Sequence, residues 1–185
     1  MFLGCTSLKE VTLPVDLLKV GDVVFSECTS LERVILPESL EEIGNYAFQV
    51  CSSLTNIKLP KNLKEIGIGA FGGCTSLDAI TSLANNPPIC GERCFWDVPV
   101  TTTTLNVPMG SIELYKSTDP WSAFFKIIGL NDIDSVEEIE SEKNDSYNVY
   151  NFNGLNFLNT VSKEDLDKLP AGLYIINGKK LMIKK

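Results

Sequence analysis

Four cysteines stand at a constant interval of 23 residues in the first half of the chain, at Cys5, Cys28, Cys51 and Cys74. Because a thiolate can bind a metal ion or exchange disulfides, one interpretation is a metal or redox ladder. The other is a column of small buried side chains, since free cysteine is among the most buried residue types. The shared phase of the four residues, in a chain without histidine, favours the packing role.

Two further cysteines, Cys90 and Cys94, lie only four positions apart. We align them with Gly67 and Ala70 of the preceding repeat unit, on one turn of the chain. In an oxidising compartment they could form a disulfide that fastens the end of the repeats. Packing as small side chains is the alternative interpretation, and the sequence leaves both open.

The remaining candidates for chemistry argue against an enzyme. The absence of histidine excludes Ser-His-Asp and Cys-His arrangements. Seven acidic residues and one lysine gather in residues 131–146, where a solvated acidic linker explains them better than a paired-carboxylate hydrolase. The string Gly67-x-Gly69-x-x-Gly72 is missing from the other repeat copies, which argues against a phosphate-binding loop. We therefore predict no enzymatic activity, no metal and no cofactor.

The cysteines belong to a 23-residue unit that occurs four times and begins Phe-x-x-Cys-[Thr/Ser]-Ser-Leu. Within a unit, alternation predicts a short strand with Ile57 and Leu59 inward and Lys58 outward. Pro60 ends this strand. Residues 63–71 have apolar positions three or four apart, as in a helical or 3₁₀ turn. A fixed period predicts a solenoid with a parallel sheet on one face and helical turns on the other.

The last units depart from this pattern. Ser82 falls where the other units place an inward leucine, so the strand register there is open by one residue. Residues 105–108 predict a fifth strand, and residues 110–129 a short helix and a closing turn that cap the C-terminal edge. Trp96 and Trp121 could stack on sugars, but their position in this cap favours core packing.

The unit L-x-x-[IV]-x-LP-x-x-L-x-x-IG-x-x-AF-x-x-C-x-S-L resembles the BspA-type leucine-rich repeat of bacterial surface proteins over about residues 1–95. This resemblance implies a leucine-rich-repeat solenoid over residues 1–129 and a secreted or surface-displayed protein of adhesion or recognition. A structural spacer or self-association module without a specific ligand is the alternative. Because Phe2 already lies inside a repeat, we expect further repeats and an export signal upstream, and an uncapped N-terminal edge open to self-association.

A small β tail is predicted for residues 147–185, after the acidic linker at 130–146. Residues 147–154 alternate in polarity, and residues 169–183 predict two strands around an Asn-Gly hairpin turn. The pieces VYN-x-NG and LP-x-G-x-Y-I-x-NGKK resemble the C-terminal sorting tails of secreted Bacteroidetes proteins that use type IX secretion. The resemblance implies export or surface attachment. A β appendage of the solenoid is the alternative.

The outward strand positions and the residues beside them form the predicted binding surface. Its members are Thr12, Glu32, Arg33, Ile35, Thr55, Asn56, Lys58 and Asp78. We expect the partner to be a protein or glycan on host or neighbouring cells, outside the bacterium or at its outer membrane. A net charge of −8 without a basic patch argues against nucleic acid. No apolar stretch is long enough for a transmembrane segment.

Overall fold

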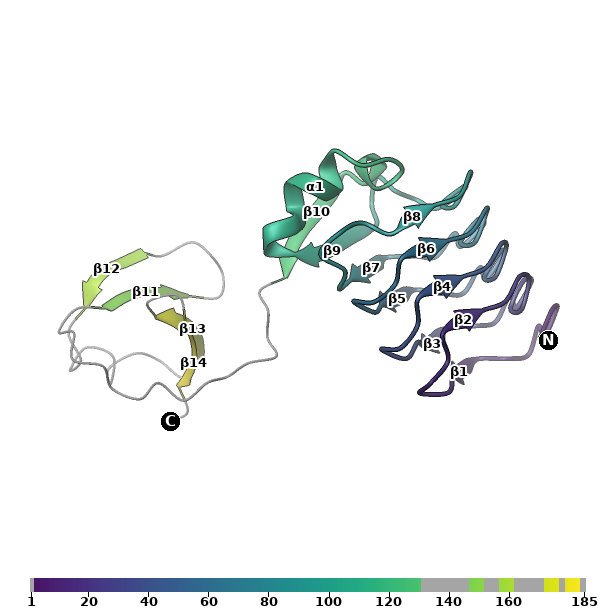
Figure 1. The fold of residues 1–185 in the computed structure, drawn as a ribbon, viewed down its shortest axis with the longest axis horizontal. Helices are drawn as coiled ribbons and strands as arrows, with labels where there is room; N and C mark the ends of the chain where they lie inside the picture. The colour runs from purple at the N-terminus through teal and green to yellow at the C-terminus, as the bar shows by residue number, and fades with distance from the viewer. Residues whose placement is uncertain (1, 131–146, 152–156, 162–171, 177–178, 184–185) are drawn as a thin grey trace. The chain divides into compact units, whose positions relative to one another are not determined.

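The protein is described by a computed structural model that divides into two compact units, Met1–Asn131 and Asp132–Lys185. The structure describes residues 2–130, 147–151, 157–161, 172–176 and 179–183 (Figure 1). The first unit is a solenoid of parallel strands. Each of its first four turns adds one strand to each of two sides, so the repeat period of the sequence becomes the layer spacing of the fold.

Six short strands form the first side of the solenoid: β1 (Glu10–Thr12), β3 (Arg33–Ile35), β5 (Asn56–Leu59), β7 (Ala79–Ser82), β9 (Thr104–Pro108) and β10 (Lys126–Leu130). They form a two-stranded sheet, β1-β3, and a four-stranded sheet, β5-β7-β9-β10, and all pairings within the two sheets are parallel. In β5 the predicted alternation is confirmed, because Ile57 and Leu59 are buried while Lys58 is exposed. The last strand, β10, was expected only as a closing turn.

The second side is a four-stranded parallel sheet that the sequence did not predict. Its strands are β2 (Lys19–Val20), β4 (Glu42–Ile43), β6 (Glu65–Ile66) and β8 (Ile89–Cys90), paired in that order. The prediction of a helical turn over residues 63–71 is therefore wrong for Glu65 and Ile66, which form β6. The backbone there bonds to the previous layer, with the Gly67 N–H donating to the Ile43 carbonyl at 2.8 Å. Because such hydrogen bonds join residues 24 positions apart, they produce no short-range pattern in the sequence.

The turns between the two sides carry a column of stacked aromatic rings. Phe2, Phe25, Phe48, Phe71 and Phe95 follow one another with ring centroids 5.3 to 5.9 Å apart. The three middle rings of the column are completely or almost completely buried. This column, with leucines and isoleucines from both sides, forms the core of the solenoid.

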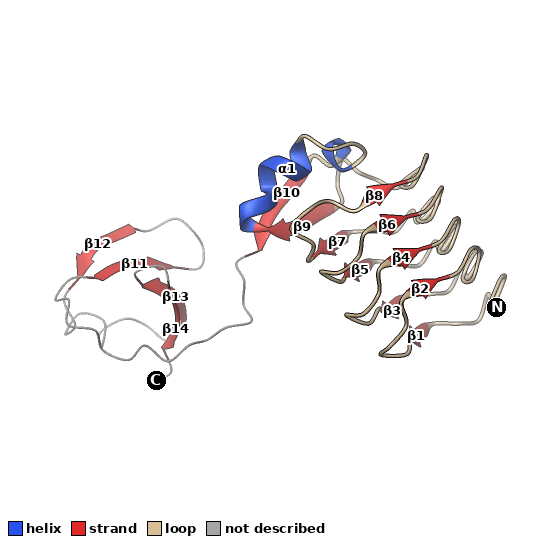
Figure 2. Cartoon of the chain, viewed as in Figure 1, coloured by secondary structure: helices blue, strands red, loops and turns tan. Residues whose placement is uncertain are grey.

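A cap closes the C-terminal end of the first unit, as predicted, and contains its helices: η1 (Met109–Ser111), α1 (Ile112–Lys116) and η2 (Trp121–Ala123) (Figure 2). Tyr115 of α1 donates its hydroxyl hydrogen to the Ala84 carbonyl at 2.9 Å and accepts from Ser82 at 2.7 Å. Burial raises the pKa of Tyr115 to about 12. Ser82 pairs with Leu59, so it occupies the inward leucine position and Tyr115 satisfies its hydroxyl.

The two tryptophans have different environments. Trp121 is fully buried and donates its indole N–H to the Pro88 carbonyl at 2.9 Å, which confirms core packing. Trp96 is 58% exposed, so core packing was the wrong prediction for it. It follows Phe95 in a turn in which Cys94 and Phe95 are buried while Trp96 and Asp97 are exposed.

The described residues of the second unit form four antiparallel strands: β11 (Tyr147–Asn151), β12 (Phe157–Val161), β13 (Gly172–Ile176) and β14 (Lys179–Ile183), in the order β12-β11-β13-β14. Strands β13 and β14 pair from Ile176 opposite Lys179, which confirms the predicted pair of strands. Strand β12 was not predicted. The Asn-Gly turn and the acidic linker at 131–146 lie outside the described residues. The domain limits at 129 and 146 stay predictions.

Candidate functional site

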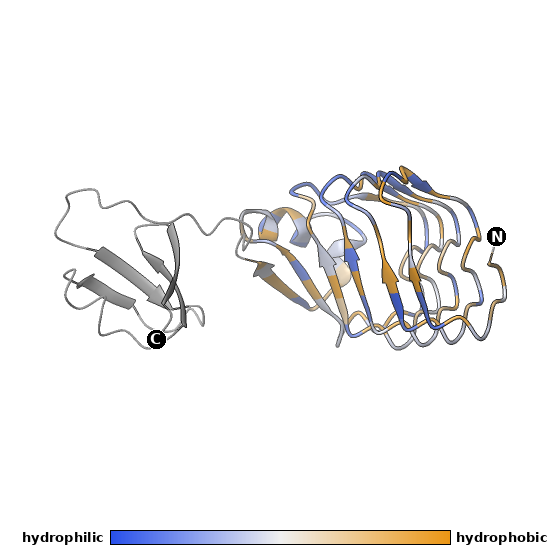
Figure 3. Cartoon of the chain, turned by 90° about the horizontal axis from the view of Figure 1, so that it is seen from below, coloured by the Kyte–Doolittle hydropathy of each residue, from blue (hydrophilic) through white to orange (hydrophobic). Residues whose placement is uncertain are grey.

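The eight residues predicted to bind a partner are all exposed on the first side of the solenoid. Five belong to strands β1, β3 and β5, and the other three directly precede a strand: Thr12, Arg33, Ile35, Asn56 and Lys58, then Glu32, Thr55 and Asp78. We call this outward surface of β1, β3, β5 and β7 the strand face. Figure 3 shows the solenoid as a mixture of hydrophilic and hydrophobic stretches.

Parallel pairing fixes the relative positions of these side chains within each of the two sheets on this side. Thr12 lies opposite Ile35, and Lys58 lies opposite Thr81 in the next layer. Ile35 is 44% exposed, which makes it the apolar contact of this row. Arg33 and Glu10 form an ion pair at 3.8 Å, but both are well exposed and the pair adds little stability. The strand face is therefore a mixed polar surface on which Ile35 is the exposed aliphatic side chain.

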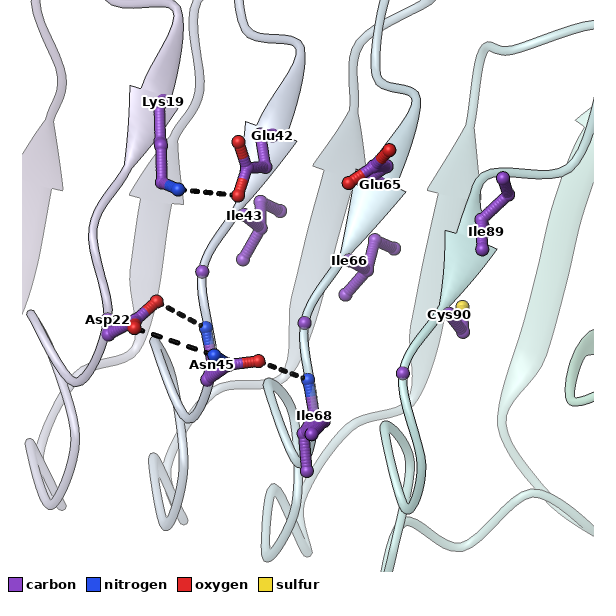
Figure 4. Close-up of a pocket in the computed structure, with 13 residues that line it drawn as sticks. Lys19, Asp22, Glu42, Ile43, Asn45, Glu65, Ile66, Ile68, Ile89 and Cys90 are labelled. Carbon is purple, nitrogen blue, oxygen red and sulfur yellow. Dashed lines mark hydrogen bonds and ion pairs between the residues drawn. The ribbon is translucent and has the colours of Figure 1, made fainter.

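A groove of about 310 Å³ lies on the second sheet, away from every predicted site residue. It runs between two rows of side chains, with a floor of glycine backbone (Figure 4). The strand row is Lys19, Glu42, Glu65 and Ile89. The corner row is Asp22, Asn45 and Ile68, and the floor glycines are Gly44, Gly67 and Gly91. Glu-Ile-Gly, repeated at Glu42 and Glu65, is the sequence signal that could have indicated it.

The floor of the groove admits no side chain. A Cβ added at Gly67 would lie 2.5 Å from the backbone nitrogen of Asn45 and 2.6 Å from the carbonyl carbon of Gly44. The corresponding atom at Gly91 would lie 2.5 Å from the backbone nitrogen of Ile68. Glycine is thus required where one layer turns directly over the next, and the channel between the two rows stays open.

Hydrogen bonds hold the corner row in place across three layers (Figure 4). The Asp22 carboxylate accepts from the backbone N–H of Asn45 at 2.8 Å and from its side-chain amide at 3.4 Å. The Asn45 side-chain oxygen in turn accepts from the backbone N–H of Ile68 at 2.8 Å. Ile68 has no side-chain acceptor to continue the ladder, so the row changes from polar to aliphatic there.

The strand row carries more negative than positive charge. The Lys19 ammonium lies 2.6 Å from the Glu42 carboxylate, and this hydrogen bond raises the pKa of Lys19. Glu65 comes next in register and makes no ion pair within the described part of the chain. Three carboxylates and one ammonium line the groove, so its potential is negative.

The cysteine column is a packing element, as predicted. Cys28, Cys51 and Cys74 are buried, and their thiols donate to the carbonyls of the phenylalanines one layer earlier at 3.0 to 3.2 Å. Burial raises the pKa of all three and brings that of Cys74 to about 12. Cys5, in the first layer, is exposed, so the buried packing position predicted for it was wrong.

The other cysteine pair is placed differently from the sequence alignment. Cys90 pairs with Ile66, and Gly91 takes the position of Gly67, so the alignment of Cys90 with Gly67 was wrong. The extra residue of this layer therefore lies between residues 82 and 89. Cys94 does occupy the position of Ala70, because its carbonyl accepts a hydrogen bond from the backbone N–H of Phe71 in the preceding layer, as the Ala70 carbonyl accepts one from Phe48. Both cysteines are free thiols in the structure.

We expect Cys5 to react rapidly with a disulfide reagent such as 5,5′-dithiobis(2-nitrobenzoate) at pH 8, and the three buried thiols to react at least a hundredfold more slowly. The thiolate is the reactive species, and burial both hides the sulfur and keeps the proton on it. Peptide mapping after timed labelling measures each site, with unfolded protein as the control. Equal rates at Cys5 and Cys51 in folded protein would contradict the buried column.

Comparison with known proteins agrees with this architecture. The family described as BspA type leucine rich repeat region matches residues 1–102 and 69–165, with six copies of the repeat. A crystal structure of a leucine-rich repeat protein from Bacteroides ovatus ATCC 8483 is similar, with 30% identity and a TM-score of 0.51. The match covers 69% of this chain and 31% of that one. No curated protein matches. The chain belongs to the BspA-type leucine-rich repeat family.

Proposed function

We propose that this chain is a non-catalytic recognition protein that binds a macromolecular partner through the strand face. The observation that carries the proposal is the row of outward side chains on the strand face, which parallel pairing holds at fixed positions from β1 to β3 and again from β5 to β7. Because these positions are already fixed, less conformational entropy is lost on binding. Leucine-rich repeats are also suited to protein interaction.

The distribution of polar groups supports binding over catalysis. On the strand face each layer contributes its own side chains, and successive layers lie about 4.8 Å apart. Catalysis needs a base, a nucleophile or acid, and a stabilising donor that converge on one reacting atom. Within the described residues the strand face carries a line of separate contacts, which suits an extended partner.

The family also supports a proposal for the location and the partner of this chain. BspA-type repeats are typical of surface and secreted proteins, which supports display outside the cell and adhesion to a protein or glycan on host or neighbouring cells. The resemblance of residues 147–185 to sorting tails supports export through type IX secretion. No helix among the described residues is long and apolar enough to cross a membrane.

A spacer or self-association module is the second candidate, and the first layer favours it. Val15 and Leu18 are 79% and 60% exposed there. A second copy could cover these side chains. A spacer has no saturable ligand, whereas an adhesin does, so a binding isotherm separates the two candidates.

Replacement of Lys58 by Glu should weaken binding to the partner at least about tenfold, because it reverses a charge in the middle of the strand face. Ile35→Glu should do the same by removing the aliphatic contact. The measurement is saturable binding of fluorescent protein to intact host cells and to immobilised extracellular-matrix proteins. Lys61→Glu, an equal charge change at an exposed residue outside the face, is the matched control.

Two outcomes of this binding experiment would contradict the proposal. If neither cells nor matrix proteins show saturable binding, the recognition proposal is wrong and the spacer is left. If Lys58→Glu and Lys61→Glu weaken binding equally, the partner senses net charge and the strand face is not the site.

A further inference from the structure

We propose that the groove on the second sheet binds an extended peptide segment in which a lysine or arginine neighbours an aliphatic residue. This is a second binding surface, separate from the strand face, on the opposite strands of each layer. The strand row and the corner row of Figure 4 are the side chains that would contact this peptide.

The dimensions of the groove fit a short stretch of extended chain. The strand row runs over four successive layers, from Lys19 to Ile89. Three layer spacings of about 4.8 Å give a length of about 14 Å, which is about four residues at about 3.3 Å each. The glycine floor offers no side chain to block the approach of a peptide backbone.

Charge complementarity selects the basic residue of the partner. Glu65 stands in the middle of the strand row without an ion pair among the described residues, next to Glu42 in the same register. Lys19 is already held by Glu42 at 2.6 Å, so it offsets one carboxylate and leaves the other free. A cationic side chain placed over Glu65 therefore meets an excess of negative charge, and an anionic segment is repelled.

The aliphatic residue of the partner is selected at the other end of the groove. Ile68 is 41% exposed and Ile89 is 72% exposed, and they interrupt both polar rows at neighbouring layers. In the layer before each of them, these positions hold Asn45 and Glu65, which water solvates well. The groove thus changes from acidic to aliphatic along its length, and a segment that pairs a cation with a branched apolar side chain covers both parts.

The test uses the full chain and a fluorescent, N-acetylated and C-amidated peptide of sequence Gly-Lys-Ile-Lys-Ile-Gly, with fluorescence polarisation as the measurement. We expect saturable binding to the unmodified protein. Glu65→Lys should weaken it at least tenfold and Glu65→Gln severalfold. Glu38→Lys, the same charge change at an exposed residue outside the groove, should have less than a twofold effect.

Two further peptides separate the contributions of charge and apolar contact. Gly-Glu-Ile-Glu-Ile-Gly should not bind, and Gly-Lys-Gly-Lys-Gly-Gly should bind severalfold more weakly than the lysine–isoleucine peptide. Absence of binding by the lysine–isoleucine peptide, or equal losses in Glu65→Lys and Glu38→Lys, would overturn the site. Equal binding of both lysine peptides would overturn the aliphatic part.

The experiment also stands apart from the strand-face proposal. Lys58→Glu lies on the other side of the solenoid and should leave peptide binding at least as strong as in the unmodified protein. If peptide binding succeeds while adhesion fails, the groove is established without the strand face. If Lys58→Glu abolishes peptide binding, the peptide is not in the groove.

Discussion

Replacement of Phe48 by alanine is expected to lower the free energy of unfolding by about 3–5 kcal/mol. The ring is completely buried and lies between Phe25 and Phe71, with centroid distances of 5.4 and 5.5 Å. Its removal takes away the buried apolar area and leaves a cavity that two neighbouring layers cannot both fill. Urea denaturation followed by far-ultraviolet circular dichroism measures the change.

The column contains its own control for this prediction. Phe2 stacks on Phe25 at 5.3 Å, but it has one ring neighbour and is 45% exposed. Phe2→Ala should therefore cost less than half as much as Phe48→Ala. A loss below about 1 kcal/mol at Phe48, or equal losses at the two sites, would contradict a buried aromatic column.

Gly67→Ala is the second substitution with a large expected effect, a loss of about 1–3 kcal/mol from overpacking. The new methyl group would lie 2.5 Å from one backbone nitrogen of the previous layer and 2.6 Å from one of its carbonyl carbons. Backbone atoms cannot move aside as the end of a side chain can, so the two layers must separate. The shift of the urea midpoint, with the slope checked for constancy, measures the loss.

Gly21→Ala tests the same position where the crowding is absent. Gly21 corresponds to Gly67 in the first layer, and its Cβ would meet only a methyl group of Val24, at 3.4 Å. We expect no destabilisation, or a gain of about 0.4–1 kcal/mol from the stiffer unfolded chain. If both alanines destabilise equally, the cause is local backbone conformation and the stacking explanation fails.

Much of the solenoid was predictable because its causes are local or periodic. Phe48, Cys51 and Leu54 recur at one interval, and identical units that stack must place identical residues over one another. The alternation around Lys58 identified the first set of strands, since side chains of a strand point alternately to its two faces. Hence the buried columns and the exposed strand face followed from spacing alone.

The second sheet was not predictable in the same way. Its strands are two residues long, and a pair such as Glu65-Ile66 shows no alternation to recognise. What makes it a strand is the bond from Lys64 N–H to the Glu41 carbonyl in the previous layer, at 2.8 Å. The misplacement of Cys90 by one position has the same origin, because only pairing with Ile66 fixes its register.

Residue spacing therefore established the repeat and the core columns, and composition excluded histidine-based chemistry within this sequence, because these are properties of the linear chain. The groove required the folded chain. Its two rows and its glycine floor come from four turns of the solenoid, and the excess charge at Glu65 exists only because Lys19 pairs with Glu42 in the layer between them. Stacking brings residues about 23 positions apart within a few ångströms of each other, and the sequence of one repeat does not specify these contacts.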